Sequence, residues 1–350
     1  MTVPERLPRI LPMPASQQKP FDPYPFKFKE IFQKTIWGGT DLKKVLGKKC
    51  PAKTGESWEL SFRENNVSVV ANGAYKGKKI TDLVKSWGKE ILGDDHSMRF
   101  MKGFPLLVKF LGMRERMSLQ VHPSDEFAQR YEMDGTGKME AWYILHAPKD
   151  SRVIRGVLPG TTVAEFQEAL DGGRIEQCLN VMEVNQGDVI FIPPGTIHTA
   201  YGGVVVLEVQ QNSDHTYRMT DWDRKGFDGK PRALDVEKAL SMTDFYSMGV
   251  SKYKPSRMAA YSYKRMLLLK CEKFTLESIQ MKRGRVTIEA DRARFRIYTV
   301  VSGRGKFLYG SKKKTDLAWR KGETFLVPAH LGEFDISSPA AAEIVVSYVE

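Results

Sequence analysis

The sequence has few cysteines and no long apolar run. Both features argue against particular classes of protein. Its 350 residues include only three cysteines, Cys50, Cys178 and Cys271. An odd number of widely spaced cysteines favours neither a disulfide framework nor a thiolate metal site, so we expect three free thiols. No apolar run approaches the roughly 20 residues that a helix needs to cross a bilayer. We therefore expect a soluble protein with no membrane partner.

The first 25 residues also lack an apolar stretch of signal-peptide length. This segment, MTVPERLPRILPMPASQQKPFDPYP, contains seven prolines. Such a composition is typical of a flexible extension rather than of a targeting segment. We therefore expect residues 1–25 to be a flexible, proline-rich extension, and the protein to be cytoplasmic.

Acidic residues are too few to balance the basic ones. The chain has 54 Lys and Arg against 42 Asp and Glu, which gives a formal net charge of +12 with neutral histidines. A basic excess can attract nucleic acid, an acidic surface or an anionic small molecule. The basic clusters, KGKK from Lys76 and KKK from Lys312, are short and lack interleaved aromatic residues. We expect a solvated basic surface that attracts an anionic small molecule and no nucleic acid. The oligomeric state stays unknown.

Short strand-like segments dominate the chain from Phe104 onward. They are FPLLVKFL, SLQVH, AWYILHA, SRVIRGV, DVIFIPPG and GVVVLEVQQ, separated by glycine and proline turns. Their close spacing predicts a β-sandwich or barrel. Helices are expected in ITDLVKSWGKEILG, in TTVAEFQEALDGGRIEQCLNVM, which starts at a threonine cap, and in RALDVEKALSM.

A weak internal repeat divides the β-rich region. The segment KGETFLVPAHLGEFDI from Lys321 has the same order of features as QGDVIFIPPGTIHTAY from Gln186. Each has glycine and an acid, then an apolar strand, a proline and a histidine. The repeat predicts two copies of one β-barrel.

Polar residues at fixed places in these segments suggest a common site. Gln120 and His122 lie two residues apart in SLQVH, so in a strand they point to the same face. The stretch GDVIFIPPGTIH ends at His198 and is similar to the second motif of the cupin barrels. The stretch SLQVHPSDEFAQRYEMDGTGKMEAWYIL is a loose version of their first motif, and in it Glu140 begins the next apolar run. In cupins such motifs meet around one metal, which implies that Gln120, His122, Glu140 and His198 converge.

Two imidazole nitrogens, one carboxylate oxygen and one amide oxygen fit Zn²⁺, and also Mn²⁺, Fe²⁺ or Co²⁺. The competing interpretation is that His122 caps a turn, His198 is a hydrogen-bonded core residue, and the other two are polar residues at strand edges. The four offsets together favour one metal ion per chain. His330 takes the corresponding place in the second repeat but lacks such partners, so we expect it to be structural.

A longer series of motifs resembles the type I mannose-6-phosphate isomerases, particularly their short bacterial form. The motifs are IWGG at Ile36, GESWELS at Gly55, FPLLVKF at Phe104, LQVHPSDE at Leu119, GKMEAWYIL at Gly137, IPPGTIHTAYGG at Ile192 and EVQQNSDHTYRMTDWDR at Glu208. The similarity runs from about Phe26 to the C-terminus. The proline-rich extension, and PSDE where PDDE is commoner, depart from the family pattern without touching a proposed ligand.

The resemblance implies a zinc enzyme that interconverts mannose 6-phosphate and fructose 6-phosphate through an enediolate. It implies a mainly β fold of two cupin-like double-stranded β-barrels, or jelly rolls, with helical insertions. We expect a catalytic metal-binding domain over residues 26–250, which includes the helical insert, and a degenerate second domain over residues 251–350 without metal.

The resemblance also implies roles for single residues. It carries over Gln120, His122, Glu140 and His198 as metal ligands, Arg218 as the active-site arginine, Lys138 as a lysine beside the metal, Trp37 as an aromatic near the pocket and Ser118 as a phosphate contact. Other roles stay open for three of them. Arg218 can instead pair with Asp221 or Asp223, Lys138 can be a solvated loop residue, and Trp37 can belong to the core.

Aldose–ketose isomerisation needs a group that moves a proton between neighbouring carbons. Glu208 interrupts the apolar run VVVLEVQQ, where burial without a partner can raise the pKa of a carboxyl group. It is the first candidate for the base. A metal-activated water is the other candidate, and a structural pair between Glu208 and an arginine is the alternative to a catalytic role.

Two other functions are compatible with a metal-binding barrel. One is a cupin metalloenzyme of different chemistry, such as an Fe-dependent dioxygenase, and the other is a non-catalytic sugar-phosphate sensor. A sensor has no evident need for both Glu208 and a complete ligand set. The sequence therefore favours the isomerase.

Overall fold

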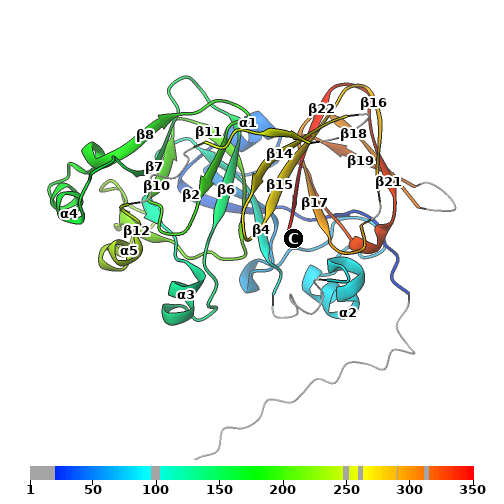
Figure 1. The fold of residues 1–350 in the computed structure, drawn as a ribbon, viewed down its shortest axis with the longest axis horizontal. Helices are drawn as coiled ribbons and strands as arrows, with labels where there is room; N and C mark the ends of the chain where they lie inside the picture. The colour runs from blue at the N-terminus through cyan, green and yellow to red at the C-terminus, as the bar shows by residue number, and fades with distance from the viewer. Residues whose placement is uncertain (1–19, 96–102, 247–251, 259–262, 290, 311–314) are drawn as a thin grey trace, which may run out of the picture.

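Two β-structures lie side by side in this chain, drawn mainly in green and in orange to red in Figure 1. The structure is a computed structural model that describes residues 20–95, 103–246, 252–258, 263–289, 291–310 and 315–350. None of the helices in these ranges has the length and apolar character needed to span a membrane.

The first β-structure consists of two antiparallel sheets. The six-stranded sheet has the order β2-β3-β4-β11-β6-β9, with β2 (Ile31–Gly39), β3 (Thr54–Leu60), β4 (Leu106–Met113), β6 (Glu140–His146), β9 (Val189–Ile192) and β11 (Val204–Gln211). The five-stranded sheet has the order β12-β5-β10-β7-β8, with β5 (Leu119–Val121), β7 (Arg152–Val157), β8 (Leu179–Glu183), β10 (His198–Tyr201) and β12 (Tyr217–Thr220).

The second β-structure also has two antiparallel sheets. The seven-stranded sheet has the order β1-β20-β17-β22-β15-β14-β13, with β1 (Phe26–Lys27), β13 (Ser256–Met258), β14 (Lys264–Lys270), β15 (Thr275–Met281), β17 (Arg296–Ser302), β20 (Thr324–Val327) and β22 (Ala342–Tyr348). The four-stranded sheet has the order β16-β21-β18-β19, with β16 (Gly284–Ile288), β18 (Arg304–Tyr309), β19 (Thr315–Arg320) and β21 (Phe334–Ser338).

Strands β4 and β11 form the centre of the six-stranded sheet and are buried along their whole length. Their side chains alternate between two apolar layers. Leu111 and Val206 face the interior of the first β-structure, whereas Phe110 and Leu207 belong to a layer that includes residues of the second. The site-bearing sheet is thus fixed from both faces.

Five α-helices and three short 3₁₀ turns connect the described strands. The α-helices are α1 (Asp41–Leu46), α2 (Ile80–Leu92), α3 (Asp125–Tyr131), α4 (Val163–Asp171) and α5 (Val236–Met242), and the turns are η2 (Glu64–Asn66), η3 (Ile175–Cys178) and η4 (Ala329–Leu331). The helix expected in ITDLVKSWGKEILG is α2, and the one expected in RALDVEKALSM is α5. Thr162 caps α4 and forms a capping box with Glu165, as the threonine cap predicts.

One part of the expected helical insert is wrong. The residues LNVM at its end form β8, which pairs with β7. The helix cannot reach them because Gly173 adopts a left-handed φ of 67°, and the turn η3 then redirects the chain.

The strand pattern confirms the predicted fold class. All six segments expected as strands from Phe104 onward contain strands, and the protein is mainly β with helical insertions. Strands β2 and β3 lie in a region that the sequence left as mixed, because IFQKTIWGG and TGESWEL carry polar residues in place of an apolar run.

Residues 1–19 of the expected extension lie outside the described residues, whereas residues 20–25 pack on the folded chain. Tyr24 is buried, and its ring stacks on Tyr75 with centroids 5.8 Å apart. Phe21 stacks on the same ring at 5.9 Å. These aromatic contacts hold the segment that leads into β1.

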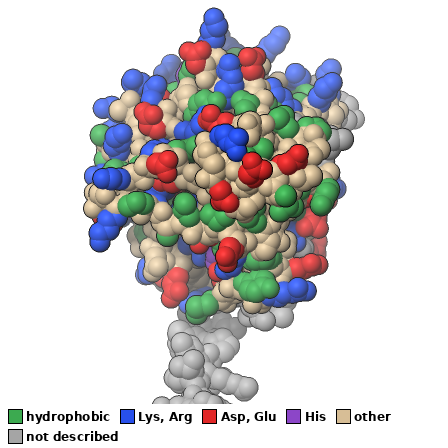
Figure 2. Space-filling view, turned by 90° about the vertical axis from the view of Figure 1, so that its left-hand side faces the viewer, with side chains coloured by type: hydrophobic (Ala, Val, Ile, Leu, Met, Phe, Trp, Pro, Cys, Tyr) green, Lys and Arg blue, Asp and Glu red, His purple; other side chains and the backbone are tan. Residues whose placement is uncertain are grey.

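The surface around α4 shows how the excess positive charge is distributed on one face. Figure 2 shows basic, acidic and apolar side chains interspersed there, with no field of a single sign.

Candidate active site

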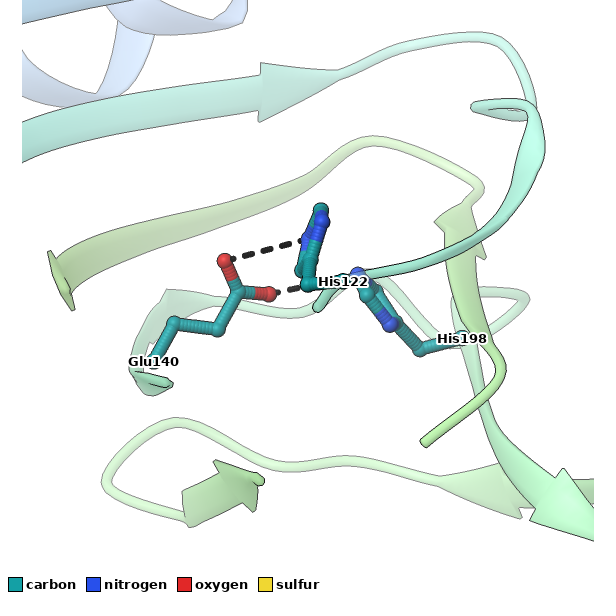
Figure 3. A group of neighbouring side chains, drawn as sticks. All are labelled: His122, Glu140 and His198. Carbon is teal, nitrogen blue, oxygen red and sulfur yellow. Dashed lines mark ion pairs between the residues drawn. The ribbon is translucent and has the colours of Figure 1, made fainter. Parts of the chain in front are cut away.

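Three side chains from separate strands meet inside the first β-structure. His122 directly follows β5, Glu140 begins β6, and His198 begins β10. All three are buried, and one donor atom of each lies within 4.8 Å of the others. The Glu140 carboxylate points toward both rings, with Oε2 3.5 Å from His122 Nε2 and Oε1 3.2 Å from His198 Nε2 (Figure 3).

Backbone carbonyls fix the form of both imidazole rings. Nδ1 of His122 lies 2.9 Å from the carbonyl oxygen of His215, and Nδ1 of His198 lies 2.9 Å from that of Thr196. A carbonyl oxygen only accepts, so each Nδ1 carries the proton and each Nε2 keeps its lone pair when the ring is neutral. Burial, aided by the Lys138 cation, lowers the pKa of His122 to about 3. His122 is therefore neutral at physiological pH.

Gln120 joins this cluster from β5. Its Cα is registered opposite His198 of β10, and its Nε2 lies 3.1 Å from His198 Nε2. The hydroxyl of Ser118 donates to Gln120 Oε1 at 3.3 Å. A half-turn of the amide exchanges its oxygen and nitrogen, so Gln120 can offer an oxygen at the same place.

The atoms of the cluster that lack a hydrogen bond fit a divalent metal. His122 Nε2 and both oxygens of Glu140 are buried without a hydrogen-bond partner among the described residues. Lys138 Nζ forms an ion pair with Glu140 Oε2 at 3.1 Å. Burial alone would raise the pKa of Glu140, but the charge of Lys138 lowers it well below its usual value. Two imidazole nitrogens and one carboxylate are a donor set for Zn²⁺ and similar ions.

A cavity of about 260 Å³ opens beside the cluster. Its lining includes Trp37, Ser118, Gln120, Lys138, Glu208 and Arg218, all of which the sequence assigned to the site. It also includes polar or charged residues that the sequence did not single out: Gln33, Thr35, Glu56, Asn66, Lys109, Asp214, Thr216 and Arg232. The structure thus brings the expected residues together around one space.

The register of the six-stranded sheet places a row of side chains along the cavity. Lys109 of β4 is opposite Trp58 of β3 and Glu208 of β11, and Glu208 is opposite Trp142 of β6. Directly paired residues of antiparallel strands point to the same face. These four residues therefore share the inner face with Glu140, which lies two residues before Trp142.

Glu208 is buried, and one of its two oxygens has no hydrogen-bond partner among the described residues. Its Oε2 accepts a hydrogen bond from Trp142 Nε1 at 2.7 Å, while Oε1 has no hydrogen-bond partner among the described residues and lies 3.5 Å from Lys109 Nζ. Burial, followed by the charge of Glu140, raises the pKa of Glu208, and Lys109 opposes this rise. From the sequence, the alternative to a catalytic role for Glu208 was a structural pair with an arginine. In the structure the basic residue beside Glu208 is Lys109.

Lys109 is the cation that sequence reasoning missed. Its Nζ lies 3.6 Å from Glu56, 3.5 Å from Glu208 and 3.7 Å from Asp214, and 4.7 Å from the centre of the Trp58 ring. Burial by itself would lower the pKa of Lys109, but these carboxylates raise it above its usual value. The sequence feature that could have identified it is a charged residue within the apolar segment FPLLVKF.

The side chain of Arg218 lines the cavity, and its guanidinium forms no ion pair with a carboxylate among the described residues. Its Nε is buried and has no hydrogen bond. Asp221, one of its expected alternative partners, instead holds Arg224 at 2.6 Å and Arg232 at 2.7 Å. Burial, followed by the charge of Arg232, lowers the pKa of Arg218. The guanidinium of Arg218 is thus left for a ligand.

The structure also locates Lys138, Trp37 and His330. Lys138 is buried and paired with Glu140, so it is not a solvated loop residue. Trp37 is both a member of the apolar core and part of the cavity wall. His330 lies in the turn η4, where its Nε2 is 3.2 Å from Asp94. His198, in contrast, begins a strand, so the two histidines do not take equivalent positions.

Comparisons with known proteins agree on one family. Residues 26–138 match the family model of the phosphomannose isomerase type I catalytic domain. Mannose-6-phosphate isomerase ManA of Bacillus subtilis is 33% identical over 331 residues, which cover 93% of this chain and 99% of that protein. Mannose-6-phosphate isomerase of Streptococcus mutans is 32% identical, with coverage of 87% and 92%. The crystal structure of the mannose 6-phosphate isomerase from Bacillus subtilis superimposes with a TM-score of 0.82 at 31% identity, and covers 93% of this chain and 99% of that one.

Proposed function

The chain belongs to the type I mannose-6-phosphate isomerases and is an intramolecular aldose–ketose isomerase; on this premise we propose that it interconverts mannose 6-phosphate and fructose 6-phosphate with one bound Zn²⁺. The proposed ligands are Gln120, His122, Glu140 and His198. The observation that carries the proposal is the buried donor set, in which His122 Nε2 and both Glu140 oxygens lack a hydrogen-bond partner among the described residues. A divalent cation would satisfy these atoms.

Negative charge develops on two neighbouring substrate oxygens during isomerisation. When bound, the metal supplies a Lewis acid that stabilises this charge without a change of oxidation state. Lys138, held 3.1 Å from Glu140, adds a positive charge at the same end of the cavity. The site is therefore suited to an enediolate.

Glu208 is proposed as the group that takes the proton from one carbon and returns it to the next. The hydrogen bond from Trp142 orients the carboxylate, and Oε1 is left without a hydrogen-bond partner among the described residues. Its raised pKa suits a general base, because a base works best when its pKa approaches the working pH. Lys109 beside it limits the rise in pKa.

Arg218 and Ser118 are proposed to bind the phosphate, and Trp37 to lie against the sugar. The unpaired guanidinium nitrogen of Arg218 supports its role, because a guanidinium forms paired hydrogen bonds with a phosphate. Ser118 is buried and lines the same cavity. The apolar face of Trp37 suits the C–H side of a sugar ring.

Neither of the two rival functions is favoured by the comparisons. The relatives that cover most of this chain carry the name of an isomerase, not of a dioxygenase or a sensor. Metal content measured together with oxygen uptake separates the isomerase from an Fe-dependent dioxygenase. Turnover of the sugar phosphate separates it from a sensor that only binds.

The proposal includes the division of the chain into a catalytic domain, residues 26–250, and a second domain, residues 251–350, without metal. All proposed ligands and cavity residues precede residue 233. The interior of the second β-structure is filled by bulky apolar side chains such as Tyr298, Phe307 and Trp319, which supports its lack of a metal site. The three cysteines are free, as a reducing compartment would keep them, which supports the cytoplasm.

The metal site can be tested by metal analysis and a coupled assay of fructose 6-phosphate formation. We expect about one zinc per chain, loss of activity with a chelator, and its recovery when zinc is added back. His122→Ala and His198→Ala should each lose metal and activity together, whereas His146→Ala, at an exposed position, should lose neither. Full stoichiometric metal in the double variant His122→Ala/His198→Ala would contradict the site.

A further inference from the structure

Asp125 holds together three parts of the chain that are far apart in sequence. It begins α3, three residues after His122. Its Oδ1 accepts hydrogen bonds from the backbone N–H of Gly137 at 2.8 Å and from Nε2 of Gln211 at 2.9 Å. Its Oδ2 pairs with Nζ of Lys273 at 2.7 Å. One carboxylate is thus fully engaged outside the cavity.

The first two partners of Asp125 lead directly to a proposed metal ligand. Gly137 begins the short segment Gly137–Glu140, which carries both Lys138 and Glu140. Gln211 holds this segment from the other side, because its Oε1 accepts from the backbone N–H of Met139 at 2.9 Å. Asp125 and Gln211 therefore fix the segment that places the Glu140 carboxylate.

The residues that follow His122 also contact the segment Gly137–Glu140. The backbone N–H of Lys138 donates to the carbonyl of Pro123 at 2.9 Å. Gly137 also packs so closely that a Cβ on it would lie 2.5 Å from the backbone nitrogen of Asp125. This approach needs glycine, and it locks the chain that follows β5 against the chain that leads into β6.

Lys273 brings the second β-structure into this arrangement. It lies in the turn between β14 and β15 of the seven-stranded sheet, with its side chain 29% exposed. Burial alone would raise the pKa of Asp125, but the hydrogen bonds from Lys273, Gln211 and Gly137 lower it. The carboxylate is therefore ionised when it meets the Lys273 ammonium.

Resting on the metal site proposed above, we infer that Asp125 is a positioning residue for the metal ligands, and that Lys273 makes the second β-structure part of this support. Asp125 is not one of the proposed ligands and does not line the cavity. It acts through Gly137 and Gln211 on Glu140, and through the start of α3 on His122. The contact between Lys273 and Asp125 thus links the second domain to metal binding in the catalytic domain.

The experiment compares zinc binding in the full chain and its variants by competition with a chelator, with zinc alone as the probe. Asp125→Ala should weaken zinc binding by about tenfold or more, because loss of a group that orients metal ligands costs roughly 10- to 100-fold in affinity. Lys273→Met should weaken it by about twofold to fivefold, the factor expected for a partly exposed ion pair. The double variant should bind zinc no more weakly than Asp125→Ala.

The matched control is Asp316→Ala, which breaks the exposed ion pair with Lys306 on the second β-structure, away from the cavity. It should leave zinc affinity unchanged. A purely structural role of Asp125 would lower the melting temperature of the metal-free protein and leave the zinc dissociation constant within about twofold, and this result overturns the inference. Additive losses in the double variant would overturn the role of the second β-structure. An unchanged zinc dissociation constant in Lys273→Met would overturn it as well, and this second test holds even where Asp125→Ala fails to fold. Absence of zinc from the unmodified protein would instead overturn the proposed metal site.

Discussion

Glu208→Gln is the substitution that tests the proton-transfer step most directly. Glutamine has nearly the same volume as glutamate and keeps an oxygen that can accept the hydrogen bond from Trp142 Nε1. It cannot take up a proton at neutral pH. The variant therefore removes the chemistry of the side chain while leaving its place in the sheet occupied.

The expected loss follows from the place of Glu208 in the cavity. Loss of a general base lowers kcat by about two to four powers of ten, which corresponds to about 2.7 to 5.4 kcal/mol in activation free energy. The KM for mannose 6-phosphate should change little, because Arg218 and Ser118 are unaltered. Lys109 keeps Glu56 and Asp214 as carboxylate partners, at 3.6 and 3.7 Å, so the fold should persist.

The pH dependence of kcat/KM is a second test of Glu208 as the base. A base must be ionised, so kcat/KM of the unmodified enzyme should fall as the pH drops through the pKa of Glu208. Burial and the charge of Glu140 raise that pKa, so this acid limb should lie above the usual glutamate value of about 4.3. The Glu208→Gln variant should lack the limb.

The assay is steady-state kinetics on purified proteins between pH 5 and 9, roughly the range in which a raised carboxyl pKa is visible, with zinc content measured in each sample. A kcat within a factor of about three of the unmodified enzyme, at full metal content, would refute the assignment. The base role would then pass to a metal-activated water or to another residue. A collapse of zinc content would show that the substitution had damaged the metal site instead.

The remaining predictions concern Arg218 and His330. Arg218→Lys should raise KM for the phosphosugar by about tenfold or more and lower kcat less, because one ammonium replaces a bidentate guanidinium; an unchanged KM would remove Arg218 from the phosphate site. His330→Ala should leave kcat and zinc content nearly unchanged, since His330 contacts Asp94 in a turn of the second β-structure. A loss of activity by orders of magnitude in a folded variant would show that His330 matters for catalysis.

Much of the fold was open to prediction because its signals are local. Apolar segments such as GVVVLEVQQ, separated by glycine and proline turns, correspond directly to strands. Strands β2 and β3 gave no such signal, because Gln33, Thr35 and Glu56 face a polar cavity instead of a core. LNVM was misassigned because its helix-compatible residues follow a glycine turn, and only pairing with β7 makes them a strand.

Part of the candidate site could also be predicted from the sequence, and part of it could not. The four proposed ligands lie in short motifs whose offsets can be read from the chain, and the structure brings them to one place. The neighbours of Lys109 could not be read in this way, because they depend on the register between β3, β4 and β11. Lys109 itself interrupts an apolar run just as Glu208 does, so the reasoning applied to Glu208 would have identified it as well.

The two sheets of the first β-structure contribute different halves of this site. Gln120, His198 and Arg218 belong to the five-stranded sheet, where Gln120 is registered opposite both other residues. Glu140, Lys109 and Glu208 belong to the six-stranded sheet. Register fixes distances within each sheet, whereas the distance from one half to the other depends on the apolar residues packed between the sheets and on the contacts of Asp125 and Pro123 with the segment that leads into β6. A motif can therefore specify which donor atoms are present, whereas the packing around residues such as Trp142 and Leu111 decides whether those atoms meet closely enough to hold one ion.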